Sequence, residues 1–217
     1  MLSNQFRHVY QFRIVLKDTK PPIWRRIQVP DNYSFKDLHV AIQNVMDWEV
    51  YAGSSYEFRI ARPSKGLVET IACSCFGFSQ YAATHEPLKR IADYFSPRNP
   101  KASYTSKHKS NWDFTIELEE ILVADKFEKY PICIKGKRAS PPEDCGGANK
   151  YQEILKTISE SSSRSSGKAL KLYQGVLEDD FDPNYFDRDN VFFTADSGNP
   201  PLPDDLPERL MKIFKEL

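Results

Sequence analysis

The chain has 217 residues, of which 40% are hydrophobic and 28% are charged, and its 30 basic and 30 acidic residues cancel. These proportions are typical of a folded globular protein and exclude the disordered and collagen-like classes. Because the net charge is zero, no overall field draws the protein to nucleic acid or to an anionic membrane, and such binding would need a local patch.

The amino-terminal segment and the cysteines indicate a cellular compartment. Residues 1–10 carry scattered polar side chains where a signal peptide needs an apolar run, and no segment approaches the roughly 18 apolar residues of a membrane span. The four cysteines are irregularly spaced and too few for a disulfide scaffold. We therefore expect a single-domain cytoplasmic protein with free thiols and no membrane contact.

Alternating apolar residues predict two paired strands near the amino terminus. Residues 10–17 alternate first, Pro21-Pro22 forces a turn, and residues 23–29 resume the alternation until Pro30, which lacks the donor that a sheet ladder needs. The solvent side of the second strand then carries Trp24, Arg26 and Gln28. An exposed tryptophan beside an arginine is a candidate partner contact.

Helical and strand patterns follow in turn. Ser34 and Asp37 resemble a capping box, and apolar residues at helical spacing continue to about Asp47. Further strands are expected at residues 56–61, 112–122 and 130–135, and helices at residues 87–95 and 151–158. Residues 62–81 predict a loop with at most one strand.

The carboxyl-terminal third mixes a mobile loop with helix signals. The Ser-rich residues 160–168 lack apolar side chains and predict a mobile loop. Asp182-Pro183 predicts a helix start, and residues 207–217 predict an amphipathic helix. Strands paired through turns, with few helices, favour an α+β fold with an antiparallel sheet covered on one side.

Several short strings occur together in a characteristic order. They are Pro21-Pro22-Ile23-Trp24-Arg25-Arg26, a helix with Leu38, His39, Ile42, Gln43, Met46 and Trp48, then Tyr56-Glu57-Phe58, Pro131-Ile132-Cys133, Gly136-Lys137-Arg138-Ala139, Pro141-Pro142-Glu143-Asp144-Cys145-Gly146-Gly147, and Phe181-Asp182-Pro183 with Phe186-Asp187. In these strings the chain resembles the plasmid pRiA4b ORF-3-like family, sometimes described as passenger proteins of mobile elements.

The resemblance covers roughly residues 10–190 and sets expectations about the fold. It implies a roll-like α+β domain, with a strongly curved antiparallel sheet and helices packed on one side, and no characterised biochemical role. Residues 1–9 would then form an amino-terminal extension and residues 191–217 a carboxyl-terminal extension with the amphipathic helix.

The chain departs from the family where polar side chains cluster. Members typically carry Tyr-Asp-Phe-Gly-Asp before the tryptophan and a histidine two residues after it. Here residues 106–110 read Ser-Lys-His-Lys-Ser before Trp112, and Phe114 follows. A histidine usual ahead of the Glu-Phe pair is replaced by Ser54-Ser55-Tyr56. If those acids and histidines form a site in relatives, this chain has lost or rebuilt it.

The loop from Pro141 to Gly147 is the best functional candidate in the sequence. Glu143 and Asp144 offer carboxylates, Cys145 offers a thiol, and Gly146-Gly147 permits close approach of the backbone just before a helix. The favoured alternative is structural: Asp144 caps the loop or helix, Cys145 is buried, and the glycines allow a tight turn.

A second candidate is a local basic and aromatic segment. No acid occurs between Tyr94 and Trp112, and Lys107, Lys109 and Trp112 are the candidate binding residues of this segment. Lys137 and Arg138 could extend the surface to bind phosphate or nucleic acid. The favoured alternative is a solvated loop, and the acidic residues 178–189 could equally pair with this segment.

His39 and the cysteines are weaker candidates. His39 borders the apolar stripe of its helix, so a hydrogen-bonded boundary histidine is favoured over a catalytic base. Cys73 and Cys75, with Cys133, Cys145 or His85, have poor spacing for a structural zinc site. We expect no metal and no cofactor.

These patterns support two hypotheses from different classes. The first is a non-enzymatic interaction module that binds a protein or nucleic acid through the face bearing Pro141–Gly147 and the basic segment. The second is an enzyme acting on a nucleic acid or nucleotide through Glu143, Asp144, Cys145 and His39. An enzyme requires these groups to converge in one pocket with shifted ionisation, whereas a module needs only an exposed surface. The sequence leaves open the partner, the oligomeric state and whether the protein is an enzyme.

Overall fold

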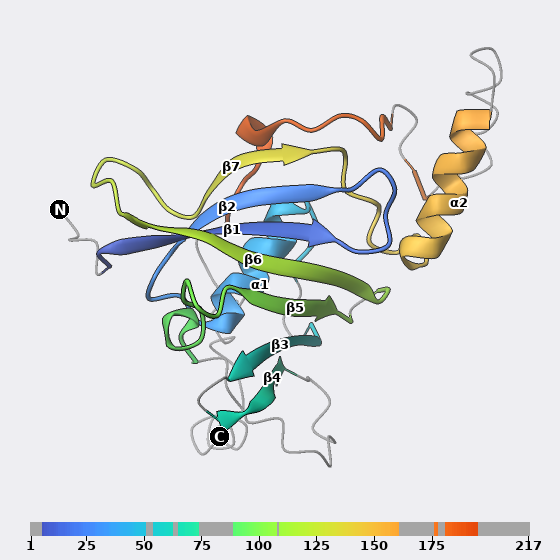
Figure 1. The fold of residues 1–217 in the computed structure, drawn as a ribbon. Coiled ribbons are helices and arrows are strands. Elements are labelled where there is room, and N and C mark those ends of the chain that lie inside the picture. Colours follow the sequence, from blue (N-terminus) through green and yellow to red (C-terminus); the bar gives the residue numbers. More distant parts are fainter. Residues whose placement is uncertain are drawn as a thin grey trace, which may run out of the picture.

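The fold is built on one antiparallel sheet. A computed structural model describes residues 6–50, 54–62, 65–73, 89–107, 109–160, 176–177 and 181–194. Within these ranges seven strands pair in the order β4-β3-β5-β6-β1-β2-β7, and each neighbouring pair is antiparallel (Figure 1). The strands are β1 His8–Leu16, β2 Trp24–Pro30, β3 Tyr56–Arg62, β4 Leu67–Cys73, β5 Lys101–Ser106, β6 Trp112–Val123 and β7 Ile132–Lys137.

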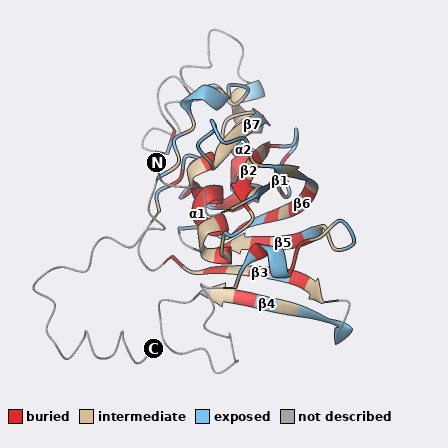
Figure 2. Ribbon diagram, turned by 90° about the vertical axis from the view of Figure 1, so that its left-hand side faces the viewer, coloured by how far each residue is buried: buried red, intermediate tan, exposed pale blue. Residues whose placement is uncertain are grey.

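The core lies between one face of the sheet and helix α1, Phe35–Val45. In β1 the inward residues Phe12, Ile14 and Leu16 are buried, as the alternation predicts. Figure 2 shows α1 as mostly buried, with some residues of intermediate exposure, and Figure 1 shows it lying behind the sheet. The predicted α+β class with an antiparallel sheet is confirmed. The sheet is not closed into a barrel, so its strong curvature stays a prediction.

Local capping fixes where α1 begins. The Ser34 hydroxyl accepts a hydrogen bond from the Asp37 backbone, and the Asp37 carboxylate accepts one from the Ser34 backbone. The predicted capping box is therefore present, with aspartate in place of the usual glutamate. It presents Phe35 and Leu38 to the sheet, where both are fully buried.

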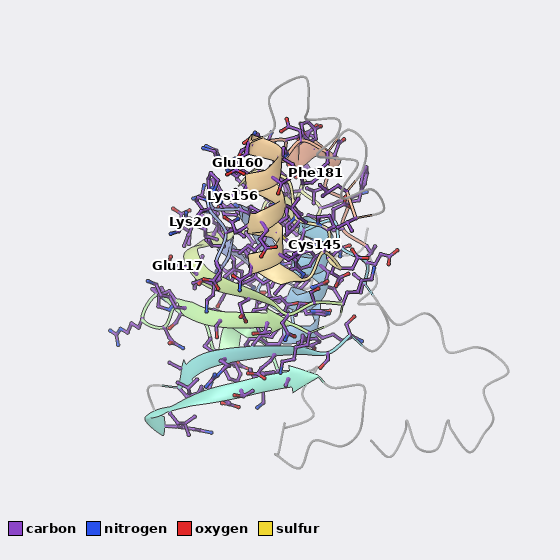
Figure 3. All side chains as sticks on the ribbon, turned by 90° about the vertical axis from the view of Figure 1, so that its right-hand side faces the viewer. Lys20, Glu117, Cys145, Lys156, Glu160 and Phe181 are labelled. Carbon is purple, nitrogen blue, oxygen red and sulfur yellow. The ribbon has the colours of Figure 1, made fainter. Side chains whose placement is uncertain are left out.

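Helix α2, Gly147–Glu160, stands at the end of the sheet near the β1–β2 turn. The Lys20 backbone N–H donates to the Gln152 side chain, which ties that turn to the helix. Tyr151 and Ile154 are the buried residues of its middle turns. Figure 3 shows Cys145 at the base of α2 and Phe181 beside it, where the Phe181 ring packs against Tyr151 at a centroid distance of 6.5 Å.

Three predictions of local structure are wrong or incomplete. Part of the basic segment is strand β5, which the sequence pattern did not show. The predicted helix at residues 87–95 is reduced, among described residues, to one 3-10 turn, Ile91–Asp93. Asp182-Pro183 begins a turn rather than an α-helix: the Asp182 carboxylate accepts from the Asn184 backbone, the Asp182 carbonyl accepts from the Tyr185 N–H, and no α-helix follows among the described residues.

Some predictions fall on parts of the chain outside the described residues. These are the Ser-rich loop beyond Glu160, the amphipathic helix at 207–217, His85, and the side chains of Cys73 and Cys75. A second 3-10 turn, Arg188–Asn190, packs against β7. None of the described helices is long and apolar enough to span a membrane.

Candidate functional site

A cavity of about 690 Å³ lies where the end of α1, the loop after β7 and the segment 181–191 meet. We call it the α1-end pocket. It is lined by Arg25, Asn44, Val45, Met46, Asp47, Trp48, Glu49, Lys109, Ala139, Ser140, Pro141, Pro142, Glu143, Val176, Phe181, Asp182, Tyr185, Phe186, Asp187, Asn190 and Val191. Its size is within the range of ordinary ligand pockets, and it includes part of the predicted Pro141–Gly147 loop.

Two tryptophans hold the loop that forms one wall of the pocket. The Trp48 indole N–H donates to the Pro141 carbonyl at 2.8 Å, and the Trp112 indole N–H donates to the Glu143 carbonyl at 2.8 Å. The two rings also pack together, with centroids 5.4 Å apart. Because both indoles are buried, this pair fixes the backbone on each side of Pro142.

Glu143 is a buried carboxyl without hydrogen bonds among the described residues. Its side chain is only 5% exposed, and neither carboxylate oxygen has a hydrogen-bond partner there. The nearest cation is the Lys109 ammonium, 4.0 Å from Oε2. Burial raises the pKa of Glu143, and Lys109 opposes that rise only in part. The pocket therefore contains an acid whose ionised form is poorly solvated.

Arg25 is a buried cation that also lines the pocket, and sequence reasoning missed it. Its guanidinium donates to the backbone carbonyls of Val45, Trp24 and Lys137 and to the Ser140 hydroxyl. Burial lowers its pKa to about 10. The signal was available, because the alternation that puts Trp24 outward puts Arg25 inward.

The Phe186 ring covers Arg25 and forms part of the pocket wall. The guanidinium carbon lies 3.9 Å from the centroid of this ring, which is cation–π geometry. Gly136, which pairs with Arg25 across β2 and β7, leaves room for the ring. A Cβ at this position would collide with Phe186. Gly136 thus permits the ring to pack close to β7.

The rest of the Pro141–Gly147 loop mostly fits the structural alternative, in which Cys145 is buried and the glycines allow a tight turn. Cys145 is buried and its pKa is raised to about 11, with burial as the main cause, so its thiol is protonated at neutral pH. Gly146 and Gly147 have φ values of 94° and 87°, which turn the chain into α2. Asp144 is exposed, and no hydrogen bond of the described residues shows it acting as a cap.

His39 is separate from the pocket and lies in the core. Its Nδ1 is 2.7 Å from the Tyr104 hydroxyl, and its ring stacks on Tyr56 at 4.1 Å. The same hydroxyl accepts from the Gln43 amide at 2.9 Å. Burial lowers the pKa of His39 to about 3, so the ring is neutral at pH 7. The structural interpretation of His39 describes its surroundings better than the catalytic one.

The basic segment is largely paired with glutamates. Lys107 lies 2.8 Å from Glu57, and Lys109 lies 3.5 Å from Glu49. Trp112, expected on this surface, is instead fully buried. Among the described residues, Lys107 and Lys109 pair with glutamates of a strand and a loop, and these pairs do not involve the acidic residues after 178. The segment therefore offers less free positive charge than its sequence suggests.

The other predicted binding residues lie on different surfaces. Lys137 is exposed on the edge strand β7, and Arg138 hydrogen-bonds Asn184. Trp24 and Arg26 share the outer face of the sheet, as predicted, with the Arg26 guanidinium 5.6 Å from the Trp24 ring. Arg26 Nε and Nη2 also donate to the two carboxylate oxygens of Glu119, at 2.5 and 2.7 Å. These residues do not join the α1-end pocket.

Metal-binding geometry is not apparent in the described part of the chain. No group of three histidine, cysteine, aspartate or glutamate side chains there could hold an ion. Cys133 and Cys145 are both free thiols.

Comparison with known proteins places the chain among uncharacterised relatives. The family model described as "Plasmid pRiA4b ORF-3-like protein" matches residues 8–190. A solved structure described as a protein of unknown function, MM3350 from Methanosarcina mazei Go1, is similar with a TM-score of 0.74 and 39% identity, covering 87% of this chain and all of that one. The uncharacterised protein y4hQ of Sinorhizobium fredii is 24% identical over 163 residues, or 75% of this chain and 79% of that protein.

Proposed function

We propose that this chain, which belongs to the plasmid pRiA4b ORF-3-like protein family, is a non-enzymatic binding module that holds a segment of a partner protein in the α1-end pocket. The observation that carries the proposal is Glu143, a residue of the pocket lining whose buried carboxyl has no hydrogen-bond partner among the described residues. A buried polar group without a partner is costly, so it is expected where a ligand supplies the missing interaction.

The walls of the pocket suit a peptide. Four aromatic rings line it, from Trp48, Phe181, Tyr185 and Phe186. Aromatic side chains give large contact area with little conformational entropy and are enriched where proteins bind one another. Because Trp48 and Trp112 hold the loop from behind, the wall around Glu143 is fixed before a partner arrives.

Charge argues against nucleic acid as the partner at this pocket. The lining carboxylates are Asp47, Glu49, Glu143, Asp182 and Asp187, whereas the lining cations are Arg25 and Lys109. A phosphate backbone would meet mostly negative charge. The lysines of the basic segment are also engaged with Glu57 and Glu49. A protein segment is therefore the better occupant of the two.

The enzyme hypothesis retains one supporting observation, the raised pKa of Glu143. A carboxyl that holds its proton at higher pH can act as a general acid, for example toward a nucleotide. The other proposed groups do not join it, because His39 is hydrogen-bonded in the core and Cys145 is a buried thiol. The binding module explains the same carboxyl without a catalytic partner.

An array of immobilised peptides of varied sequence, probed alongside DNA and RNA oligonucleotides, tests the proposed function. We expect the wild-type protein to bind a subset of peptides, and Tyr185→Ala to lose that binding because Tyr185 is an exposed lining residue. The matched control is Phe192→Ala, an exposed aromatic outside the lining, which should bind like wild type.

Other outcomes of the array would overturn the proposal. Binding to oligonucleotides with a steep salt dependence, and to no peptide, would favour a nucleic-acid module. Peptide binding that survives Tyr185→Ala would move the interface away from the α1-end pocket.

A further inference from the structure

The geometry points to a lysine side chain as the group of the partner that enters the α1-end pocket, with the Glu143 carboxylate as its counter-ion. This inference rests on the proposed function and specifies the chemistry of its ligand. Both Glu143 oxygens are buried and lack hydrogen bonds within the described residues, so an ammonium that displaces the groups covering them could donate to them.

The charge of the lining favours a cation over an anion. Of its two cations, Arg25 is engaged by three backbone carbonyls and a hydroxyl and is covered by Phe186. Lys109 lies between Glu49 and Glu143. The five carboxylates of the lining therefore exceed the positive charge that this wall can present. A cationic ligand lowers this imbalance, and an anionic ligand raises it.

The apolar part of the lining suits the stem of a lysine. Val176 and Val191 line the pocket together with the aromatic rings of Phe181 and Tyr185. Methylene groups of a lysine can pack against such surfaces while the ammonium reaches a carboxylate. Aromatic faces also attract ammonium groups. The combination of a buried carboxyl with aromatic and aliphatic walls is thus complementary to one long cationic side chain.

The protein's own Lys109 shows that an ammonium fits beside this carboxyl. Its Nζ lies 4.0 Å from Glu143 Oε2 and 3.5 Å from Glu49 Oε2. The first distance is too long for a hydrogen bond, so Lys109 interacts with Glu143 by charge alone. A ligand ammonium would compete with Lys109 for Glu143, and Lys109 could keep its contact with Glu49. Removal of Lys109 should therefore strengthen ligand binding.

The three tryptophans provide a direct readout of binding. Each contributes one indole N–H signal to a ¹⁵N-correlated NMR spectrum, and Trp48 and Trp112 hold the pocket loop. Trp24 lies on the outer face of the sheet and serves as an internal control. The probes are the capped tripeptides Gly-Lys-Gly, Gly-norleucine-Gly and Gly-Glu-Gly.

We expect Gly-Lys-Gly to shift the Trp48 and Trp112 signals saturably and to leave Trp24 unchanged. Norleucine has the stem without the charge, so Gly-norleucine-Gly should bind about tenfold more weakly, and Gly-Glu-Gly should not bind.

Glu143→Gln should weaken binding of the lysine peptide by about tenfold. Asp144→Asn removes the same formal charge one residue away, outside the lining, and should leave binding unchanged. Lys109→Met should tighten binding by about threefold or more.

Two results would overturn the inference, and they are distinguishable from failure of the proposed function. The first is equal binding of the lysine and norleucine peptides that Glu143→Gln does not change. The pocket would then bind peptides without selecting a cationic side chain. The absence of any Trp48 shift with the lysine peptide would also reject the inference. In that case the peptide array with Tyr185→Ala decides separately whether the pocket binds another kind of segment.

Discussion

His39 and Glu143 are both buried ionisable residues, but the structure treats them differently. His39 lies between α1 and the sheet, where its ring stacks on Tyr56 and its Nδ1 contacts the Tyr104 hydroxyl. Glu143 lies in a loop on the α1-end pocket, where its carboxylate has no hydrogen bond among the described residues. Burial alone therefore does not identify a functional group; the presence or absence of partners separates structural roles from candidate sites.

The origin of the difference is the secondary structure that carries each group. Gln43 and His39 lie one turn apart on α1, so both reach Tyr104 on β5. Gln43 also approaches the Ser106 hydroxyl at 3.4 Å. Glu143 instead follows two prolines in a loop, where its backbone carbonyl is held by Trp112 and its side chain is left to the pocket. The following predictions test whether the core network contributes mainly stability and the pocket mainly binding.

The largest expected effect is from His39→Ala. The substitution opens a cavity under Tyr56 and leaves the Tyr104 hydroxyl with one partner fewer, so we expect a loss of about 3 kcal/mol in the free energy of unfolding. Urea denaturation measures it. The matched control is His8→Ala, an exposed histidine paired with Asp31, which should lose less than about 1 kcal/mol. Similar losses in both variants would contradict a special role for the core network.

Tyr104→Phe should have the next largest effect. It keeps the ring in the core but removes the hydroxyl that contacts His39 and Gln43, so two buried polar groups lose a partner. We expect a loss of about 1–3 kcal/mol. Tyr185→Phe removes an exposed hydroxyl and should cost almost nothing by the same urea measurement. If Tyr104→Phe were equally neutral, the network would not be a source of stability.

The pH dependence of stability should have opposite signs in the two regions. The pKa of His39 is about 3 in the folded protein, against 6.5 for a free side chain, so stability is lost as the pH falls below about 6.5. The pKa of Glu143 is raised above 4.5, so above pH 4.5 the folded protein still holds a proton that the unfolded chain releases. The stability contributed by this group is therefore lost as the pH rises from 4.5 through the pKa of the folded protein.

Urea midpoints between pH 4 and pH 8 separate the two contributions. His39→Gln should reduce the loss of folding stability that occurs as the pH falls. Glu143→Gln should reduce the loss of folding stability that occurs as the pH rises. If Glu143→Gln instead increased the loss of stability at high pH, the expected opposite pH dependence of the two regions would be wrong. That result would mean that the folded protein stabilises the Glu143 carboxylate.

The smallest expected effect on stability is that of Glu143→Gln at neutral pH. The amide has nearly the same shape and removes a buried charge whose nearest cation is 4.0 Å away. We expect stability to be unchanged or slightly higher, within about 1 kcal/mol. Calorimetric melting measures it. A loss of more than about 2 kcal/mol would show that Glu143 contributes to the fold itself and would weaken its assignment to the pocket.

The fold was largely predictable wherever the pattern is local. The alternation of residues 10–17 and 23–29 corresponds to β1 and β2, and Ser34 with Asp37 forms the capping box of α1. Strand β5 could not be predicted, because its small polar residues carry no strong pattern. It is stabilised by pairing with β3 and β6, where Tyr104 meets Phe58 and Phe114.

The candidate site was predictable only in part. The Pro141–Gly147 loop was identified by its prolines, glycines and carboxylates, yet its members separate: Glu143 lines the pocket, Asp144 is exposed and Cys145 is buried. Arg25 carried a usable signal, since it lies on the inward side of an alternating strand. No sequence signal pointed to its hydrogen bonds to Val45 and Ser140, because these residues are 20 and 115 positions away along the chain.

The sequence by itself determined the class of the fold, the pairing of the first two strands and the start of α1, since these depend on the period of apolar residues and on contacts a few residues apart. Tertiary structure decided the site. Trp48 and Trp112, which are 93 and 31 residues away from the carbonyls they bind, meet at one loop. Their packing buries Glu143 beside Lys109. Burial of a carboxyl and the loss of its hydrating water depend on which distant segments surround it, and no local pattern encodes that environment.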